Sequence, residues 1–290
     1  MPVLYSYTAM IPSLPPSTGP IGVFDSGYGG LTILDKIRGL MPEYDYIYLG
    51  DSARCPYGPR SFEVVYEFTL QAVSKLFELG CPLVILACNT ASAKALRTIQ
   101  QINLPVIDAT RRVLGVIRPT AECIGEITRS RHVGILATAG TIKSESYLLE
   151  IHKLSPDIVV TGEACPMWVS LVENNEYQSE GADYFVKQHI NRLLDKDPMI
   201  DTIILGCTHY PLLLDKIRQF TPGHIRIIAQ GEYVARSLQD YLNRHPKMDA
   251  RCEKVGKCRF LTTESENKFE ESASIFLGRQ DIKVESIALE

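Results

Sequence analysis

Short apolar runs rich in Val and Ile alternate with amphipathic segments along most of this chain of 290 residues. A strand that is apolar on both faces must be covered on both faces, and helices that connect parallel strands provide that cover. The alternation therefore predicts an α/β fold. We expect strands at residues 21–25, 45–50, 83–87, 106–108, 133–137, 158–161, 202–206, 225–229 and 259–262. Helical periodicity is clearest at 62–79, 91–102, 184–194, 212–220 and 233–242.

Two of these strands end in similar sequences, ILACNTAS at 85–92 and ILGCTHYP at 204–211. They lie about one domain length apart, which indicates a weak internal repeat. We expect two similar lobes, each a mostly parallel sheet flanked by helices, with the active site in the cleft between them. An N-terminal extension would take residues 1–20, the first lobe 21–112 and the second lobe 113–219. Symmetry suggests that 220–290 returns to complete the first lobe.

Composition argues against several classes of partner. The formal net charge is -4 and the basic residues are scattered, so we expect no nucleic-acid partner. The apolar runs are far shorter than the roughly 20 residues of a membrane helix, and the first residues lack the pattern of a secretory signal. The eight cysteines include no CxxC pair. We therefore expect reduced thiols, no membrane association and a cytoplasmic location.

The two repeated sequences place a cysteine at a strand end, where parallel sheets bind ligands. The residues that follow are polar: Asn89 and Thr90 after Cys88, and Thr208 and His209 after Cys207. An isolated cysteine is most often a buried apolar residue, but polar neighbours favour a binding loop. We predict that both thiols face one crevice.

A cysteine with an ordinary pKa near ~8.5 is only slightly ionised at neutral pH, so a reactive thiol needs a neighbouring base. His209 lies two residues after Cys207, and in an extended chain this spacing puts both side chains on one face. It is therefore a candidate base. A loop histidine bonded to a backbone carbonyl is the equally simple alternative.

Two further loops should close the same sheet edge. Asp25 precedes SGYGG, whose amides suit an anion, but Thr32 occupies the position of the third glycine in a dinucleotide motif. An amino-acid carboxylate fits this loop equally well. In GDSARCPYG at 50–58, backbone N–H groups near Tyr57 and Gly58 could hold such a carboxylate.

These segments together resemble the glutamate racemases of the aspartate/glutamate racemase superfamily. The similar segments, in the family's order, are GVFDSGYGGLTIL, YLGDSARCPYG, ILACNTASA, TAGTIKSESY, CPMWVSLVE, LGCTHYPLL and FLTTESENKFEESASIFLG. The pair ACNTASA and GCTHYPL is highly specific. Ser52 stands where the family often has threonine.

The resemblance implies racemisation by two cysteines, with no cofactor and no metal. Cys88 would act on D-glutamate and Cys207 on L-glutamate, while Asp25, His209 and Glu173 would be auxiliary groups. Glu163 competes with Glu173 for the acidic role. The resemblance assigns substrate binding to Asp25, Ser26, Pro56, Tyr57, Gly58, Asn89, Thr90, Thr138, Thr141 and Thr208. It also implies supply of D-glutamate for peptidoglycan, and we expect a homodimer because dimers are the commonest soluble oligomers.

Other functions stay open at this point. A racemase or decarboxylase of the same superfamily could act on aspartate, although a decarboxylase needs only one proton donor. A cysteine hydrolase could use Cys207 with His209 and would leave Cys88 idle. A non-catalytic regulator could keep the fold and bind an amino acid or a protein.

Overall fold

The structure is a computed structural model that describes residues 18–278 and 282–289. Most of the expected N-terminal extension therefore lies outside the described residues. Gly19 is described, and it forms an isolated parallel bridge with Cys252. Within the described residues, none of the helices is long and apolar enough to cross a membrane.

The first sheet has six strands that pair in parallel, in the order β10-β9-β2-β1-β3-β4. Its strands are β1 (Ile21–Asp25), β2 (Tyr46–Gly50), β3 (Leu83–Leu86), β4 (Arg112–Gly115), β9 (Cys258–Thr262) and β10 (Val284–Ser286). Strands β2, β1 and β3 are central, so the loops at their carboxyl ends open onto the middle of the sheet edge.

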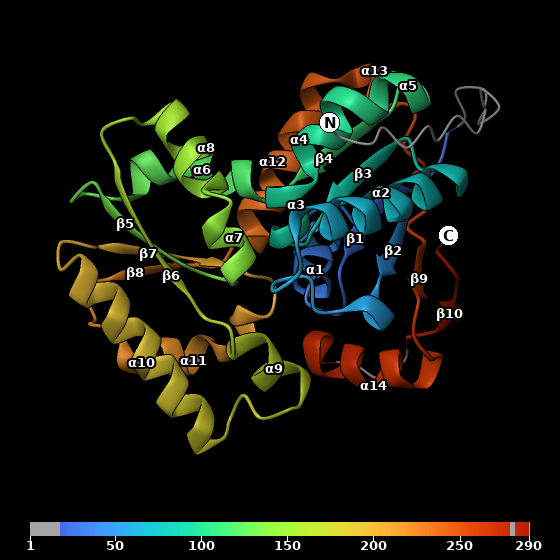
Figure 1. Ribbon diagram of the computed structural model, residues 1–290. Coiled ribbons are helices and arrows are strands. Elements are labelled where there is room, and N and C mark those ends of the chain that lie inside the picture. The colour runs from blue at the N-terminus through green and yellow to red at the C-terminus, as the bar shows by residue number, and fades with distance from the viewer. Residues whose placement is uncertain (1–17, 279–281, 290) are drawn as a thin grey trace, which may run out of the picture.

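The second sheet has four parallel strands in the order β6-β5-β7-β8. They are β5 (His132–Ala137), β6 (Val159–Ala164), β7 (Thr202–Gly206) and β8 (Arg226–Ile228). The two parallel sheets flanked by helices confirm the predicted α/β fold (Figure 1).

Helices cover both faces of each sheet (Figure 1). They are α1 (Leu31–Leu40), α2 (Phe62–Glu78), α3 (Asn89–Lys94), α4 (Leu96–Thr98), α5 (Leu104–Asp108), α6 (Ile117–Ile127), α7 (Ala139–Lys143), α8 (Ser146–Leu154), α9 (Trp168–Glu173), α10 (Glu180–Lys196), α11 (Leu214–Phe220), α12 (Gly231–Arg244), α13 (Pro246–Asp249) and α14 (Glu266–Leu277). Short helical turns are η1 (Ser52–Arg54), η2 (Ile99–Asn103) and η3 (Tyr210–Leu213).

Alternate residues of each strand pack into separate hydrophobic cores on the two faces of its sheet. Val23 of β1 packs with residues of α1, α12 and α14, whereas Phe24 packs with residues of α2 and α3. In the second sheet, Ile203 faces α10 and α11, and Ile204 faces α6 and α8. Burial on both faces explains why these strands are apolar throughout, and it fixes the sheet edge that carries the loops.

The predicted strand at 106–108 is wrong, because these residues lie in helix α5. Val106 is 84% exposed, and Pro105 occupies the first turn of the helix, where its missing N–H costs nothing. The fourth strand of the sheet is β4, which pairs with β3. An apolar, β-branched run on the surface is indistinguishable in sequence from a short buried strand.

The chain crosses between the sheets twice, after β4 and after β8, and β9 and β10 pair into the first sheet. The expected boundary between 112 and 113 would cut β4, which belongs entirely to the first sheet. We propose lobe boundaries at the two crossovers instead, near residues 116 and 229.

Candidate active site

Cys88 and Cys207 lie at the carboxyl ends of β3 and β7, in different sheets, and both line one cavity. Their side chains are almost fully buried. The cavity is narrow, about 20 Å³, which is roughly the space of one water molecule. An amino acid is larger than this cavity, so its binding requires the site to widen.

The Cys88 thiol sits in an environment that opposes ionisation. Burial, and next the charge of Asp25, raise the pKa of Cys88 to about 12. Its sulfur lies 3.5 Å from Ser26 Oγ and accepts from the backbone N–H of Ala91 at 3.4 Å, at the start of α3. These surroundings favour the protonated form of the Cys88 thiol.

Cys207 has a different neighbour, the imidazole of His209, whose Nδ1 lies 3.9 Å from the sulfur. His209 Nε2 lies 3.1 Å from Glu173 Oε1 on the other side of the ring. Burial lowers the pKa of His209, but contacts with Cys207 and Glu173 outweigh it and raise the pKa to about 10. An imidazolium beside this sulfur stabilises negative charge on it.

The contact between Cys207 and His209 arises from a turn rather than from the expected extended chain. Strand β7 ends at Gly206, and the N–H of Tyr210 donates to the Cys207 carbonyl. Phe276 of α14 then packs edge-on against the imidazole, with ring centroids 5.4 Å apart. The turn and this aromatic contact fix the direction of the ring.

Asp25 lies behind the cavity and is fully buried. Its carboxylate accepts from the Gly27 N–H at 3.0 Å and from Thr208 Oγ1 at 3.4 Å. Burial raises the pKa of Asp25, while the charge of His209 acts in the opposite direction. The carboxylate therefore links loops that follow β1 and β7.

Small polar side chains from both lobes meet at the cavity. Thr90 lies 3.0 Å from Thr138, and Thr138 lies 3.1 Å from Thr141, between hydroxyl oxygens. The cavity is lined by Ser26, Cys55, Pro56, Tyr57, Gly58, Cys88, Asn89, Thr90, Thr138, Val169, Cys207, Thr208 and His209. Asp25, Thr141 and Glu173 contact this lining without being part of it. The structure thus brings the predicted residues together, and their roles stay a prediction.

Glu163, the competing acid, is buried and belongs to a separate network with buried His189 and exposed Lys196. Its carboxylate contacts His189 Nδ1 at 2.7 Å and Lys196 Nζ at 2.6 Å. Burial opposes ionisation of Glu163, but these two partners hold its pKa below the usual range. Glu173 has the direct contact with His209.

Sequence reasoning missed Cys55 and Val169 as cavity residues. The Cys55 thiol donates to Glu173 Oε1 at 3.0 Å, and burial followed by the charge of Glu173 raises its pKa far above the usual range. The sequence signal that could have identified Cys55 as a cavity residue was its position inside GDSARCPYG. None of the eight cysteines, all within the described residues, forms a disulfide.

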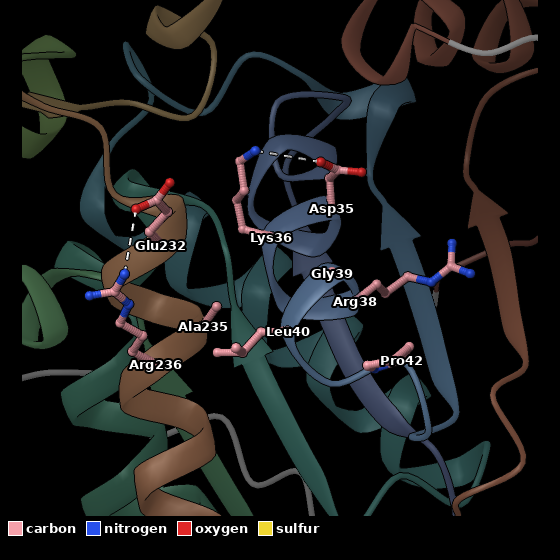
Figure 2. Close-up of a pocket in the computed structure, with 9 residues that line it drawn as sticks. All are labelled: Asp35, Lys36, Arg38, Gly39, Leu40, Pro42, Glu232, Ala235 and Arg236. Atoms are coloured by element: carbon pink, nitrogen blue, oxygen red, sulfur yellow. Dashed lines mark ion pairs between the residues drawn. The ribbon is translucent and has the colours of Figure 1, made fainter.

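A larger hollow of about 540 Å³ lies elsewhere, between α1 and α12 (Figure 2). Figure 2 shows charged side chains around it, with ion pairs Lys36–Asp35 and Arg236–Glu232. Among the described residues that line it, none is a cysteine. This hollow is larger than the cavity at Cys88 and Cys207, but without a cysteine in its lining it is not a site for thiol chemistry.

Known proteins share this sequence over most of its length. A sequence model of the Asp/Glu/Hydantoin racemase family matches residues 32–238. A glutamate racemase of Roseobacter denitrificans is 38% identical over 270 residues, which cover 90% of this chain and 97% of the relative. The chain belongs to the glutamate racemase family. Its sequence matches the family over nearly its whole length, and it is therefore an isomerase of that family.

Solved glutamate racemases share the complete fold. An isoform from Bacillus anthracis has a TM-score of 0.85 at 36% identity, with 93% of this chain and 98% of that chain covered. A glutamate racemase from Francisella tularensis, solved in complex with D-glutamate, has a TM-score of 0.82 at 31% identity, covering 94% and 98%. The relatives therefore share the α/β fold of two parallel sheets flanked by helices.

Proposed function

We propose that this protein interconverts L-glutamate and D-glutamate by moving the α-proton between two thiols. The observation that carries the proposal is that Cys88 and Cys207, from different sheets, line one cavity. Inversion by proton transfer needs an acceptor on one face of the α-carbon and a donor on the other. Two lobes that each present one thiol meet that requirement.

The His209 imidazolium beside Cys207 suits that thiol to the role of base, and the resemblance to the family assigns L-glutamate to Cys207. With L-glutamate, the Cys207 thiolate beside the His209 imidazolium takes the α-proton, and the electron pair of the C–H bond stays on the α-carbon. The Cys88 thiol then donates its proton to the opposite face, which leaves a thiolate on Cys88. With D-glutamate the same transfers run in reverse.

Hydrogen-bond donors around the cavity would stabilise the charge that develops on the substrate carboxylate. We propose Asn89, Thr90, Thr208 and the backbone amides near Ser26 for this role. The other proposed substrate contacts are Pro56, Tyr57, Gly58, Thr138 and Thr141. Glutamate is proposed as the substrate because the relatives are glutamate racemases.

Auxiliary groups tune the thiols in this scheme. We propose Glu173, rather than Glu163, as the acid that holds His209 protonated, because it contacts the imidazole directly. Asp25 would orient the loops behind the thiols.

We further propose that the enzyme needs neither pyridoxal phosphate nor metal. We also propose that it acts in the cytoplasm as a homodimer and supplies D-glutamate for peptidoglycan.

The test is incubation of the purified protein with L-glutamate in deuterated water, with a chelator present and no cofactor added. Optical rotation and the α-proton signal are followed together. We expect racemisation with incorporation of solvent deuterium. Retention of the α-proton during racemisation, or activity that depends on pyridoxal phosphate or on a metal, would contradict the proposal.

A further inference from the structure

A closed ring of three buried side chains lies against the site, and two of its members, Gln230 and Tyr147, have no role in the proposed reaction. Asn89 Nδ2 donates to Gln230 Oε1, Gln230 Nε2 donates to the Tyr147 hydroxyl, and Tyr147 donates to Asn89 Oδ1, each at 2.7 Å. All three residues are at most 3% exposed. Within the ring, each member therefore donates one hydrogen bond and accepts one.

The direction of this ring is set by a backbone carbonyl. Gln230 Nε2 also donates to the Val116 carbonyl at 3.1 Å and lies 3.2 Å from Thr120 Oγ1. A carbonyl oxygen only accepts, so the nitrogen of Gln230 must face it and the oxygen must face Asn89. Asn89 must then turn its nitrogen to Gln230 and its oxygen to Tyr147. The orientation of the Asn89 amide follows from the Val116 carbonyl.

The ring also joins both crossovers between the lobes. Val116 lies between β4 and α6, on the first crossover, and Gln230 immediately precedes α12, on the second. Asn89 begins α3 in the first lobe and Tyr147 lies on α8 in the second. The ring therefore links the two lobes beside the cavity, which Asn89 lines.

We propose that Gln230 is a positioning residue, which fixes the orientation of the Asn89 amide at the cavity. This rests on the proposed function, in which Asn89 binds the amino-acid substrate. A carboxamide has two N–H groups, and Gln230 engages one of those on Asn89. The second N–H is then the donor for the substrate. Without Gln230 the amide could rotate and present its oxygen to a carboxylate.

The first test compares Gln230→Leu with Gln239→Leu, a control on helix α12, which follows Gln230. Leucine at 230 has neither the oxygen that accepts from Asn89 nor the N–H groups for Val116 and Tyr147, so the ring cannot form. We expect the KM for both glutamate isomers to rise about tenfold, the effect of one misplaced buried hydrogen bond, whereas Gln239→Leu keeps the native KM. If Gln230→Leu does not fold, Tyr147→Phe opens the ring at another member and is expected to raise KM in the same direction.

The second test asks whether Gln230 acts through Asn89. In a double-mutant cycle, Gln230→Ala should raise KM in the native background and add nothing to Asn89→Ala. A purely structural role would lower the melting temperature equally in both backgrounds and leave KM of the folded enzyme unchanged. Additive effects on KM would overturn the proposal.

A third measurement does not depend on activity. With 15N-labelled asparagine and glutamine, the side-chain N–H signals of Asn89 are assigned by their loss in Asn89→Ala. We expect Tyr147→Phe and Gln230→Leu to shift these signals and to speed their exchange with solvent. Unchanged signals would overturn the role of Gln230 even in an active racemase. A native protein that does not racemise glutamate would instead refute the proposed function and leave the amide result readable.

Discussion

Glu173→Gln tests the electrostatic link between the auxiliary acid and Cys207. The substitution removes the charge and keeps the size of the side chain and its acceptor oxygen. In the native structure Glu173 Oε1 lies 3.1 Å from His209 Nε2, and the pKa of His209 is about 10. A hydrogen bond to a charged group contributes ~1.5–3 kcal/mol, and ~1.4 kcal/mol corresponds to one pKa unit. We therefore expect the pKa of His209 to fall by roughly one to two units.

The sign of the effect follows from which form the carboxylate stabilises. Glu173 favours the protonated ring, so its neutralisation lets His209 lose its proton at lower pH. The assay is kcat/KM for L-glutamate from pH 6 to 10, measured by circular dichroism. We expect the native rate to fall on the alkaline side near pH 10, where His209 deprotonates. In Glu173→Gln this decline should begin one to two pH units earlier.

Glu163→Gln is the matched control, because Glu163 is also a buried acid beside a histidine. It should reduce thermal stability, since His189 and Lys196 lose a charged partner, and leave the alkaline decline in place. If the alkaline decline of kcat/KM shifts to another pH in Glu163→Gln but keeps its native pH in Glu173→Gln, the assignment of Glu173 as the acid that acts on His209 is refuted.

Three further predictions concern the thiols and a close glycine contact. Cys88→Ser and Cys207→Ser should each lower kcat by about 10²–10⁴-fold; full activity of Cys88→Ser would favour a hydrolase. Iodoacetamide should label Cys207 before Cys88, because the His209 imidazolium lies beside Cys207 whereas burial and the charge of Asp25 raise the pKa of Cys88; peptide mass spectrometry that finds equal rates would contradict this. Gly29→Ala should lower kcat, because the added Cβ would lie 2.5 Å from His209 Nδ1. Gly39→Ala is the control: its added Cβ meets open space, and it should raise the free energy of unfolding by about 0.5–1 kcal/mol. Kinetics and urea unfolding distinguish the two glycine variants, and equal activities would refute the steric argument.

Most of the strands could be predicted because their apolar runs are buried on both faces of a sheet. The run at 106–108 has the same composition but lies on the surface, and only the complete fold shows this. Strand β10 was missed for the opposite reason, because only Val284 of its three residues is buried.

The pairing of Cys88 with Cys207 could be predicted because both follow strands and precede polar residues. Their contacts could not, since the turn at Cys207 and the approach of Glu173 depend on tertiary packing. Gln230 carries no local signal either. Its partners Asn89 and Tyr147 are distant in sequence, so only the folded chain reveals the ring.

The most direct test of the central claim is a crystal structure of the native protein with glutamate bound. We expect the α-carbon to lie between the sulfurs of Cys88 and Cys207, roughly 3–3.5 Å from each and with the two on opposite faces. A ligand with both sulfurs on one face of the α-carbon, or bound away from either thiol, would contradict the two-thiol mechanism.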